Sequence, residues 1–156
     1  CEICSDSRKV FNLSHLLKNQ IANEFKNDNV SIRVEDNIYL IGEADYFYMV
    51  LENIIGNAIK YSSPTDEVKV VVEDVNDMIK ISIYDNGIGI PDSEKHKVFD
   101  RFYRGVNVES NGIKGYGLGL NLVRIVVNKM GGDILILDNE PKGTIFVVDM
   151  PKLIME

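Results

Sequence analysis

Two runs rich in β-branched residues, 68–75 and 78–84, are separated in this sequence only by Asn76 and Asp77. Runs of this kind around a short polar break predict adjacent antiparallel strands. Helical patterns on both sides of the strand pair supply a layer that can cover one face of its sheet. The sequence therefore predicts an α+β fold, in which helices pack on one face of a mixed sheet.

Three amphipathic helices are predicted by apolar residues at helical spacing. The first covers about 13–25 behind the capping residue Asn12, the second begins near Asp45, and the third runs from about 119 to 130. Further short strands are predicted at 30–34, 38–41, 134–137 and 144–150. Residues 86–117 are polar and glycine-rich, with only a short helical patch at about 93–99. A connection of this length is usually a functional lid or disordered.

Length and charge limit the classes of partner. With 156 residues the chain is long enough for one domain, and its net charge of −7 repels nucleic acid and anionic lipid. No apolar run is long enough to cross a bilayer. We therefore expect no nucleic-acid partner, no direct membrane contact from this segment and a cytoplasmic location, with membrane attachment of the parent protein left open.

The cysteines give no disulfide framework. Cys1 and Cys4 are the only two in the chain and make up half of a four-ligand zinc site. We interpret residues 1–10 as a linker remnant and 11–156 as the domain.

The second helix carries two distinct faces. Its buried stripe is expected to consist of Phe47, Leu51, Ile54, Ile55 and Ala58. Asn53, Asn57 and Lys60 fall at i, i+4 and i+7 and form a separate polar stripe. Amide oxygens suit magnesium and a lysine neutralises phosphate, so the stripe is typical of a phosphate-binding cleft. For this helix alone, an ordinary solvated face is an equally good interpretation.

Two glycine-containing segments follow. Asp85 ends an apolar strand and is followed by Gly87 and Gly89, so a carboxylate that could accept a hydrogen bond from an adenine amino group precedes close-approach backbone. Taken alone, a strand-ending turn explains it better. Residues 115–120, GYGLGL, run into the third helix, where anions bind readily, although a hinge has the same pattern. The spacings of a P-loop and of a G-x-G-x-x-G dinucleotide or protein-kinase loop are absent.

The motifs together resemble the nucleotide-binding boxes of the bacterial sensor histidine kinases. They are ENIIGNAIKYS at 52–62, DNGIGI at 85–90, VFDRFYRG at 98–105, GYGLGL at 115–120 and KGTIF at 142–146, in the family's order along nearly the whole chain. The resemblance implies a Bergerat-type two-layer α/β sandwich, shared with gyrase-type and chaperone-type ATPases. ATP would lie between the helices and a flexible lid, and we expect residues 91–114 to be mobile without nucleotide.

The resemblance also implies roles for particular residues. Asn57 would coordinate Mg²⁺, Asn53 would support that site, Lys60 would contact the phosphates, Tyr61 would lie against the adenine and Asp85 would bind its amino group. Other implied nucleotide-binding residues are Gly87, Gly89, Ile90, Phe99, Gly115, Tyr116, Gly117, Leu118, Gly119, Leu120 and Thr144. In the aromatic-basic box Phe99, Arg101, Phe102 and Arg104, either arginine would hold the γ-phosphate or dock the partner domain.

Two departures matter for the chemistry. Tyr116 stands where the family often has a small Thr or Ser, which leaves the closure geometry of the lid open. Hydrolases of the wider superfamily usually place a water-activating glutamate four residues before the metal-binding asparagine, where this chain has Asn53. Glu52 is one residue off and turned about 100° away on a helix. Transfer to a protein is therefore favoured over hydrolysis.

Neither histidine has the family's acceptor pattern. His15 is followed by Leu16 rather than an acidic residue, and His96 lies in the lid, so both are expected to be surface or packing residues. The sequence thus predicts an ATP-dependent protein histidine kinase domain that uses ATP and Mg²⁺. It would phosphorylate a histidine on a separate helical dimerisation domain and serve a response regulator indirectly. The alternatives are an anti-sigma-type serine kinase and a non-catalytic nucleotide-sensing module.

Overall fold

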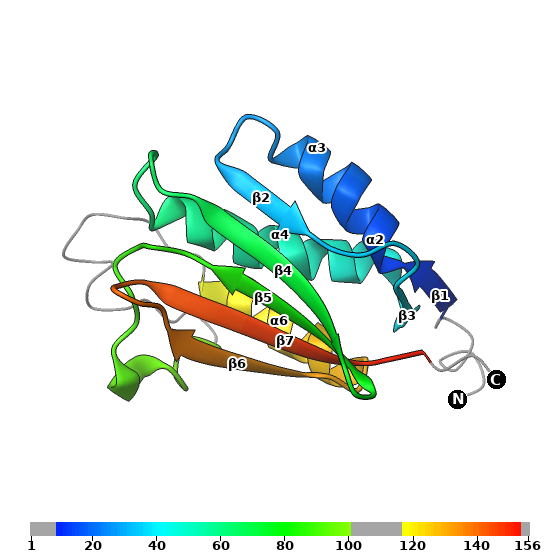
Figure 1. Cartoon of the computed structure of the whole chain (residues 1–156). Helices are drawn as coiled ribbons and strands as arrows, with labels where there is room; N and C mark the ends of the chain where they lie inside the picture. Colours follow the sequence, from blue (N-terminus) through cyan, green and yellow to red (C-terminus); the bar gives the residue numbers. More distant parts are fainter. Residues whose placement is uncertain (1–8, 101–116, 154–156) are drawn as a thin grey trace.

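A five-stranded sheet forms the centre of the fold. The computed structural model describes residues 9–100 and 117–153. The strands of this sheet are β2 (Val30–Arg33), β4 (Val68–Val75), β5 (Met78–Tyr84), β6 (Asp133–Asp138) and β7 (Thr144–Pro151). Their order is β2-β4-β5-β7-β6, in which β2 and β4 run parallel and the other neighbours antiparallel (Figure 1). The mixed sheet predicted from the sequence is confirmed, and so is the antiparallel pair β4–β5.

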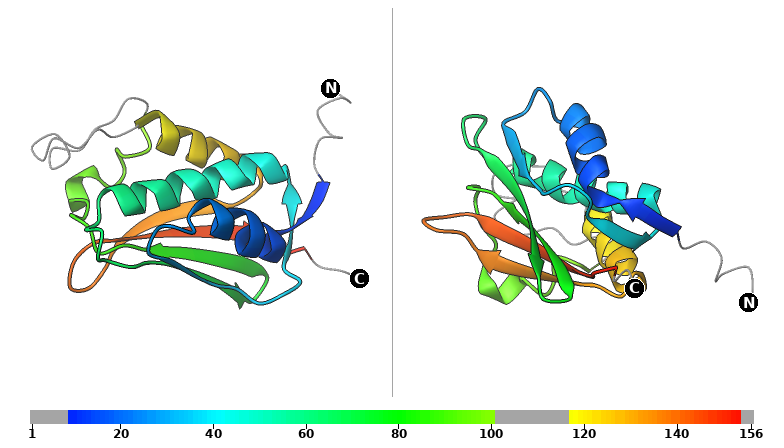
Figure 2. Two further views of the ribbon diagram at one scale, coloured as in Figure 1. Left: turned by 90° about the horizontal axis from the view of Figure 1, so that it is seen from above. Right: turned by 45° about the vertical axis from the view of Figure 1, so that its right-hand side comes forward.

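The helices cover one face of this sheet (Figure 2). They are α4 (Ala44–Lys60), α6 (Gly117–Lys129) and an N-terminal helical segment made of α2 (Leu13–His15), the π-helical η1 (Leu16–Ile21) and α3 (Ala22–Glu24). Asn12 caps the N-terminal segment as predicted, because its side-chain oxygen accepts a hydrogen bond from the His15 amide at 2.9 Å.

The core lies between the sheet and α4. Alternate strand residues point toward the helices, since side chains along a strand alternate between faces. The buried strand residues include Val70, Val72, Ile79, Ile81, Ile83, Val148 and Met150. Helix α4 meets them with the predicted stripe of Phe47, Leu51, Ile54, Ile55 and Ala58, together with Val50. This packing fixes the rotation of α4 and so decides which way its polar stripe faces.

Two short strands form a separate sheet that the sequence did not predict as such. β1 (Lys9–Asn12) pairs antiparallel with β3 (Tyr39–Gly42), with Lys9 opposite Gly42. Lys9 and Val10 fall within the segment 1–10 that we interpret as a linker remnant, and in the structure both belong to β1. A strand of four residues is too short for its periodicity to stand out from a linker.

The end of β3 also touches the far end of α6. A Cβ atom built on Gly42 would lie 2.5 Å from Cε of Met130, the residue after α6. The absence of a side chain at residue 42 therefore allows this close contact, two residues before α4 begins.

The first part of the predicted lid consists of short helical turns. In place of one helix at 93–99, the structure has the 3₁₀ turn η2 (Asp92–Glu94) followed by hydrogen-bonded turns up to residue 100, among them a bond from the Val98 amide to the Glu94 carbonyl at 3.2 Å. The rest of the segment, 101–116, lies outside the described residues, so the expected mobility of 91–114 stays a prediction.

Candidate functional site

The polar stripe of α4 faces the beginning of α6. Asn53, Asn57 and Lys60 are half-buried. The Asn53 amide nitrogen donates to the backbone carbonyl of Met49 at 2.8 Å, which leaves its carbonyl oxygen, Oδ1, directed away from α4. A Cβ atom on Gly119 would lie 2.7 Å from this Oδ1. The structure therefore brings Asn53, the first residue of the stripe, and the glycine-containing start of α6 together.

Glu52 faces a different part of the molecule. A hydrogen bond to Glu24 of α3, followed by burial and the charge of Glu24, raises the pKa of Glu52. The hydroxyl of Tyr48 also donates to Glu24, at 2.6 Å, and this bond is the main cause that raises the pKa of Tyr48 to about 12. Glu52 is thus turned toward the N-terminal helical segment and away from Asn53, as predicted from the helical rotation.

Asp85 is buried where β5 ends. The residue is only 5% exposed. Its Oδ1 accepts hydrogen bonds from the amides of Gly87 at 2.9 Å and Thr144 at 3.1 Å. The Asp85 amide donates in turn to the Thr144 carbonyl at 2.9 Å. Burial raises the pKa of Asp85, and the two backbone hydrogen bonds act in the opposite direction. A carboxylate is thus held in a fixed orientation at the end of the sheet.

Gly87 packs against the end of α4. A Cβ atom at this position would lie 2.4 Å from the backbone oxygen of Tyr61, closer than real atoms approach. Gly89 has φ +78°, the left-handed conformation that glycine adopts at little cost. The loop 85–90 and Tyr61 are therefore neighbours, as the predicted adenine site requires.

Sequence reasoning missed a set of contacts between this loop and β6. The Asn139 amide nitrogen donates to the Asp85 carbonyl at 2.8 Å. Nζ of Lys95 lies 2.8 Å from both the Ile90 carbonyl and a carboxylate oxygen of Asp138. Burial lowers the pKa of Lys95, but the bonds to Asp138 and Asp92 outweigh it, so the pKa lies above its usual value.

Phe99 lies in the core and the rest of its box cannot be described. Phe99 is buried, and the guanidinium carbon of Arg124 on α6 stands 4.9 Å from its ring centre. This contact joins the start of the lid to α6. The predicted site residues Arg101, Arg104, Gly115 and Tyr116, and Phe102 of the same box, lie outside the described residues. Gly117 and Leu118 are described only as helical backbone, and Leu120 is half-buried on α6.

The described side chains suit a metal ion only if a bound nucleotide supplies further oxygen ligands. In residues 9–100 and 117–153, no group of three or more His, Cys, Asp or Glu side chains could hold a metal ion. Magnesium takes oxygen ligands and is commonly held by one or two carboxylates and the phosphates of a nucleotide; the Asn57 amide offers an oxygen donor in place of a carboxylate. His15 and His96 are exposed, as predicted.

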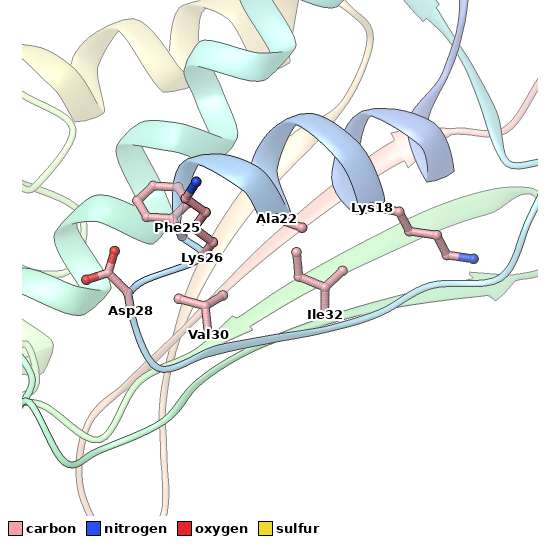
Figure 3. Close-up of a pocket in the computed structure, with 7 residues that line it drawn as sticks. All are labelled: Lys18, Ala22, Phe25, Lys26, Asp28, Val30 and Ile32. Atoms are coloured by element: carbon pink, nitrogen blue, oxygen red, sulfur yellow. The ribbon is translucent and has the colours of Figure 1, made fainter.

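A pocket lies elsewhere, between the N-terminal helical segment and the edge strand β2 (Figure 3). Its lining residues are Lys18, Ala22, Phe25, Lys26, Asp28, Val30 and Ile32. None of the predicted site residues lines it. Within the described part of the chain, no helix is both long and apolar enough to cross a lipid bilayer.

Comparisons with known proteins bear on the same residues. The model of the family described as "Histidine kinase-, DNA gyrase B-, and HSP90-like ATPase" matches residues 42–154, which include α4, loop 85–90 and α6. The sensor protein CiaH of Streptococcus pneumoniae is 32% identical over 149 residues, covering 94% of this chain and 33% of CiaH. The sensor histidine kinase WalK of Bacillus subtilis is 39% identical over 116 residues, covering 73% of this chain and 19% of WalK.

A solved structure agrees over the whole domain. The mycobacterial sensor histidine kinase MprB superposes with a TM-score of 0.80 at 26% identity, covering 95% of this chain and 99% of that one. The chain thus spans about a third or less of the length of the curated relatives it matches, and nearly all of a solved domain.

Proposed function

The chain belongs to the histidine kinase-, DNA gyrase B- and HSP90-like ATPase family, and from this membership we propose that it is the ATP-binding catalytic domain of a sensor histidine kinase. Its reaction is the transfer of the γ-phosphate of ATP to a histidine on a separate dimerisation domain. The names of the relatives CiaH and WalK, a sensor protein and a sensor histidine kinase, support the assignment.

The observation that carries transfer rather than hydrolysis is the different orientation of two neighbouring residues on α4. Asn53 lies against Gly119 at the site, whereas Glu52 is turned toward Glu24 on the N-terminal side, the residue that raises its pKa. A carboxylate that activates water must come within hydrogen-bond reach of that water. With an amide at the position facing α6, α4 offers no carboxylate to water on the side of the site where Asn53 lies. This favours phosphoryl transfer to a protein, which depends on positioning and charge stabilisation, over hydrolysis.

The proposed roles follow the chemistry of each side chain. Asp85 accepts a hydrogen bond from the adenine amino group, while Gly87 and Gly89 let the backbone of the loop approach the base next to Tyr61. Lys60 neutralises phosphate charge, and Asn57 holds Mg²⁺ with support from Asn53. The metal, when bound, neutralises charge on the phosphate oxygens.

The remaining proposals concern residues and partners beyond the described site. Gly115, Tyr116, Gly117, Leu118, Gly119 and Leu120 form the phosphate-facing end of the lid, and Ile90, Phe99 and Thr144 complete the nucleotide site. Arg101 or Arg104 meets the γ-phosphate or the partner domain. The partners are the helical dimerisation domain of the same kinase and, through it, a response regulator. The location is cytoplasmic.

Calorimetric titration of ATP, with and without Mg²⁺, tests the proposal on the wild type and on Asp85→Asn. The same samples are assayed for phosphate release, and then for transfer of labelled phosphate to the parent protein's dimerisation domain added in trans. We expect Mg²⁺-dependent binding that weakens in the variant, negligible phosphate release and label on histidine. Absence of binding, or rapid phosphate release by the domain alone, contradicts the proposal.

A further inference from the structure

Asp138, the last residue of β6, and Asn139, which follows it, hold the two ends of the loop 85–90. Asn139 holds the first residue, because its amide nitrogen donates to the Asp85 carbonyl at 2.8 Å. Asp138 holds the last residue indirectly, because its carboxylate pairs at 2.8 Å with Lys95, whose ammonium donates to the Ile90 carbonyl at 2.8 Å. The loop is thus fixed at both ends to one strand end that lies far from it in the sequence.

The ammonium of Lys95 has its full set of partners. An ammonium group has three N–H donors, and here they meet the Ile90 carbonyl and the carboxylates of Asp92 and Asp138. The Lys95 side chain is only 18% exposed, while the side chains of Asp92 and Asp138 are 89% and 61% exposed. The cation therefore lies beneath its anionic partners, and its stem and head are both held in place.

We propose that Lys95, Asp138 and Asn139 are positioning residues that hold the loop 85–90 in its nucleotide-binding geometry before the nucleotide arrives. The inference rests on the proposed function, since it assumes that the adenine binds at this loop. The clamp of these three residues acts on the loop backbone rather than on the nucleotide. A loop ordered in advance loses less conformational entropy on binding, so an intact clamp raises affinity for ATP.

The chain provides a matched control at the other end of the same sheet. Lys152 pairs with Asp74 at 2.6 Å, with side chains 39% and 40% exposed. Met78 at the start of β5 pairs with Pro151 at the end of β7, whereas Tyr84 at the clamp end pairs with Ile145. By this register the two ion pairs lie at opposite ends of the neighbouring strands β5 and β7, which Figure 1 shows side by side. Breaking the control pair changes a surface ion pair without touching the loop.

The experiment compares Lys95→Met, Lys95→Arg and Lys152→Met with the wild type. Each protein is titrated with ATP in the presence of Mg²⁺, and amide hydrogen exchange of residues 86–95 is measured without nucleotide. We expect Lys95→Met to bind ATP about fivefold to tenfold more weakly and to exchange faster across the loop. Lys95→Arg, which keeps the charge, should stay within about twofold of the wild type, and Lys152→Met should match the wild type in both measurements.

The two arms separate the clamp from the proposed function. Unchanged affinity and unchanged exchange in Lys95→Met overturn the clamp even if the wild type binds ATP well. If the wild type binds no ATP, the proposed function fails, and the exchange measurement still decides whether Lys95 holds the loop. Equal losses of affinity in Lys95→Met and Lys152→Met would point to a general effect of charge and also overturn the inference.

Discussion

The Asn53 side-chain oxygen occupies the space that a Cβ atom at Gly119 would need, since the two would lie 2.7 Å apart. Asn53 is itself fixed by its bond to the Met49 carbonyl. Helix α4 and the start of α6 therefore approach one another at the predicted site only because residue 119 has no side chain.

Gly119→Ala is expected to displace the Asn53 amide and to weaken Mg²⁺-dependent ATP binding by about tenfold, the effect of roughly 1.4 kcal/mol of steric strain. Calorimetric titration measures it. Gly56→Ala is the matched control, because a Cβ there would meet no described atom within 4 Å beyond its own stretch of helix, and α4 should gain about 0.5–1 kcal/mol of stability. Equal ATP affinity in Gly119→Ala and the wild type would contradict the prediction.

Substitutions of Gly87 and Gly89 are expected to destabilise the fold for different reasons. At Gly87 any Cβ meets the Tyr61 backbone, so alanine and asparagine should destabilise the fold similarly, by about 1–3 kcal/mol. At Gly89 the positive φ is the obstacle, and asparagine tolerates it better than alanine. Urea unfolding of the four variants checks this. A Gly87→Asn protein clearly more stable than Gly87→Ala would show that space is not the constraint.

Asp85→Asn should bind ATP about 10- to 100-fold more weakly, because an acceptor for the adenine amino group is replaced by a donor. The stability of the variant, in contrast to its affinity for ATP, should not fall at neutral pH. The folded wild type holds the Asp85 proton to higher pH than the unfolded chain, so its free energy of unfolding falls as pH rises above the ordinary value of 3.8.

Asparagine does not ionise and keeps an acceptor oxygen for the Gly87 and Thr144 amides. We therefore expect Asp85→Asn to be at least as stable as the wild type at pH 7, with the difference shrinking as pH falls. Urea unfolding across pH 4–7 tests this. A variant that is less stable at pH 7 but not at pH 4 would reverse the expected sign.

Glu52→Gln should change stability but not chemistry. Glu24 raises the pKa of Glu52, so at neutral pH the two carboxylates oppose each other, and the amide should stabilise the fold by about 0.5 kcal/mol. The gain should vanish at acid pH, where Glu52 is protonated. Transfer of labelled phosphate to the dimerisation domain added in trans should equal that of the wild type. A lower transfer would mean that Glu52 reaches the nucleotide.

The sequence predicted the elements whose patterns are long. Helix α4 carries a full apolar stripe over its 17 residues, so its start, its buried face and the separate polar stripe could all be predicted. The pair β4–β5 was predicted from two β-branched runs around a short break. The sensor kinase family followed from five motifs in order, which no single glycine segment could have indicated. The roles of the site residues stay predictions.

The clamp could not be predicted from the sequence, because its contacts join residues that are far apart in the chain. Asn139 bonds to a carbonyl 54 positions away in the sequence, and Lys95 pairs with Asp138 across a similarly long separation. Such contacts depend on how strands are ordered in the sheet, which periodicity does not specify. The Asp138-Asn139 pair, two residues before Pro141, also has an ordinary interpretation as part of a turn. No local signal singled out either residue.

The ribbon of β1 and β3 joins residues 9–12 to both large helices. Lys9 pairs with Gly42, and a Cβ atom on Gly42 would meet the Met130 side chain, so β1 is linked through β3 to the residue after α6. Two residues beyond Gly42, α4 begins and runs about 25 Å to Lys60. Because α4 is packed against the sheet along its buried face, the ribbon at one end of this helix and the polar groups at the other are held at a fixed separation.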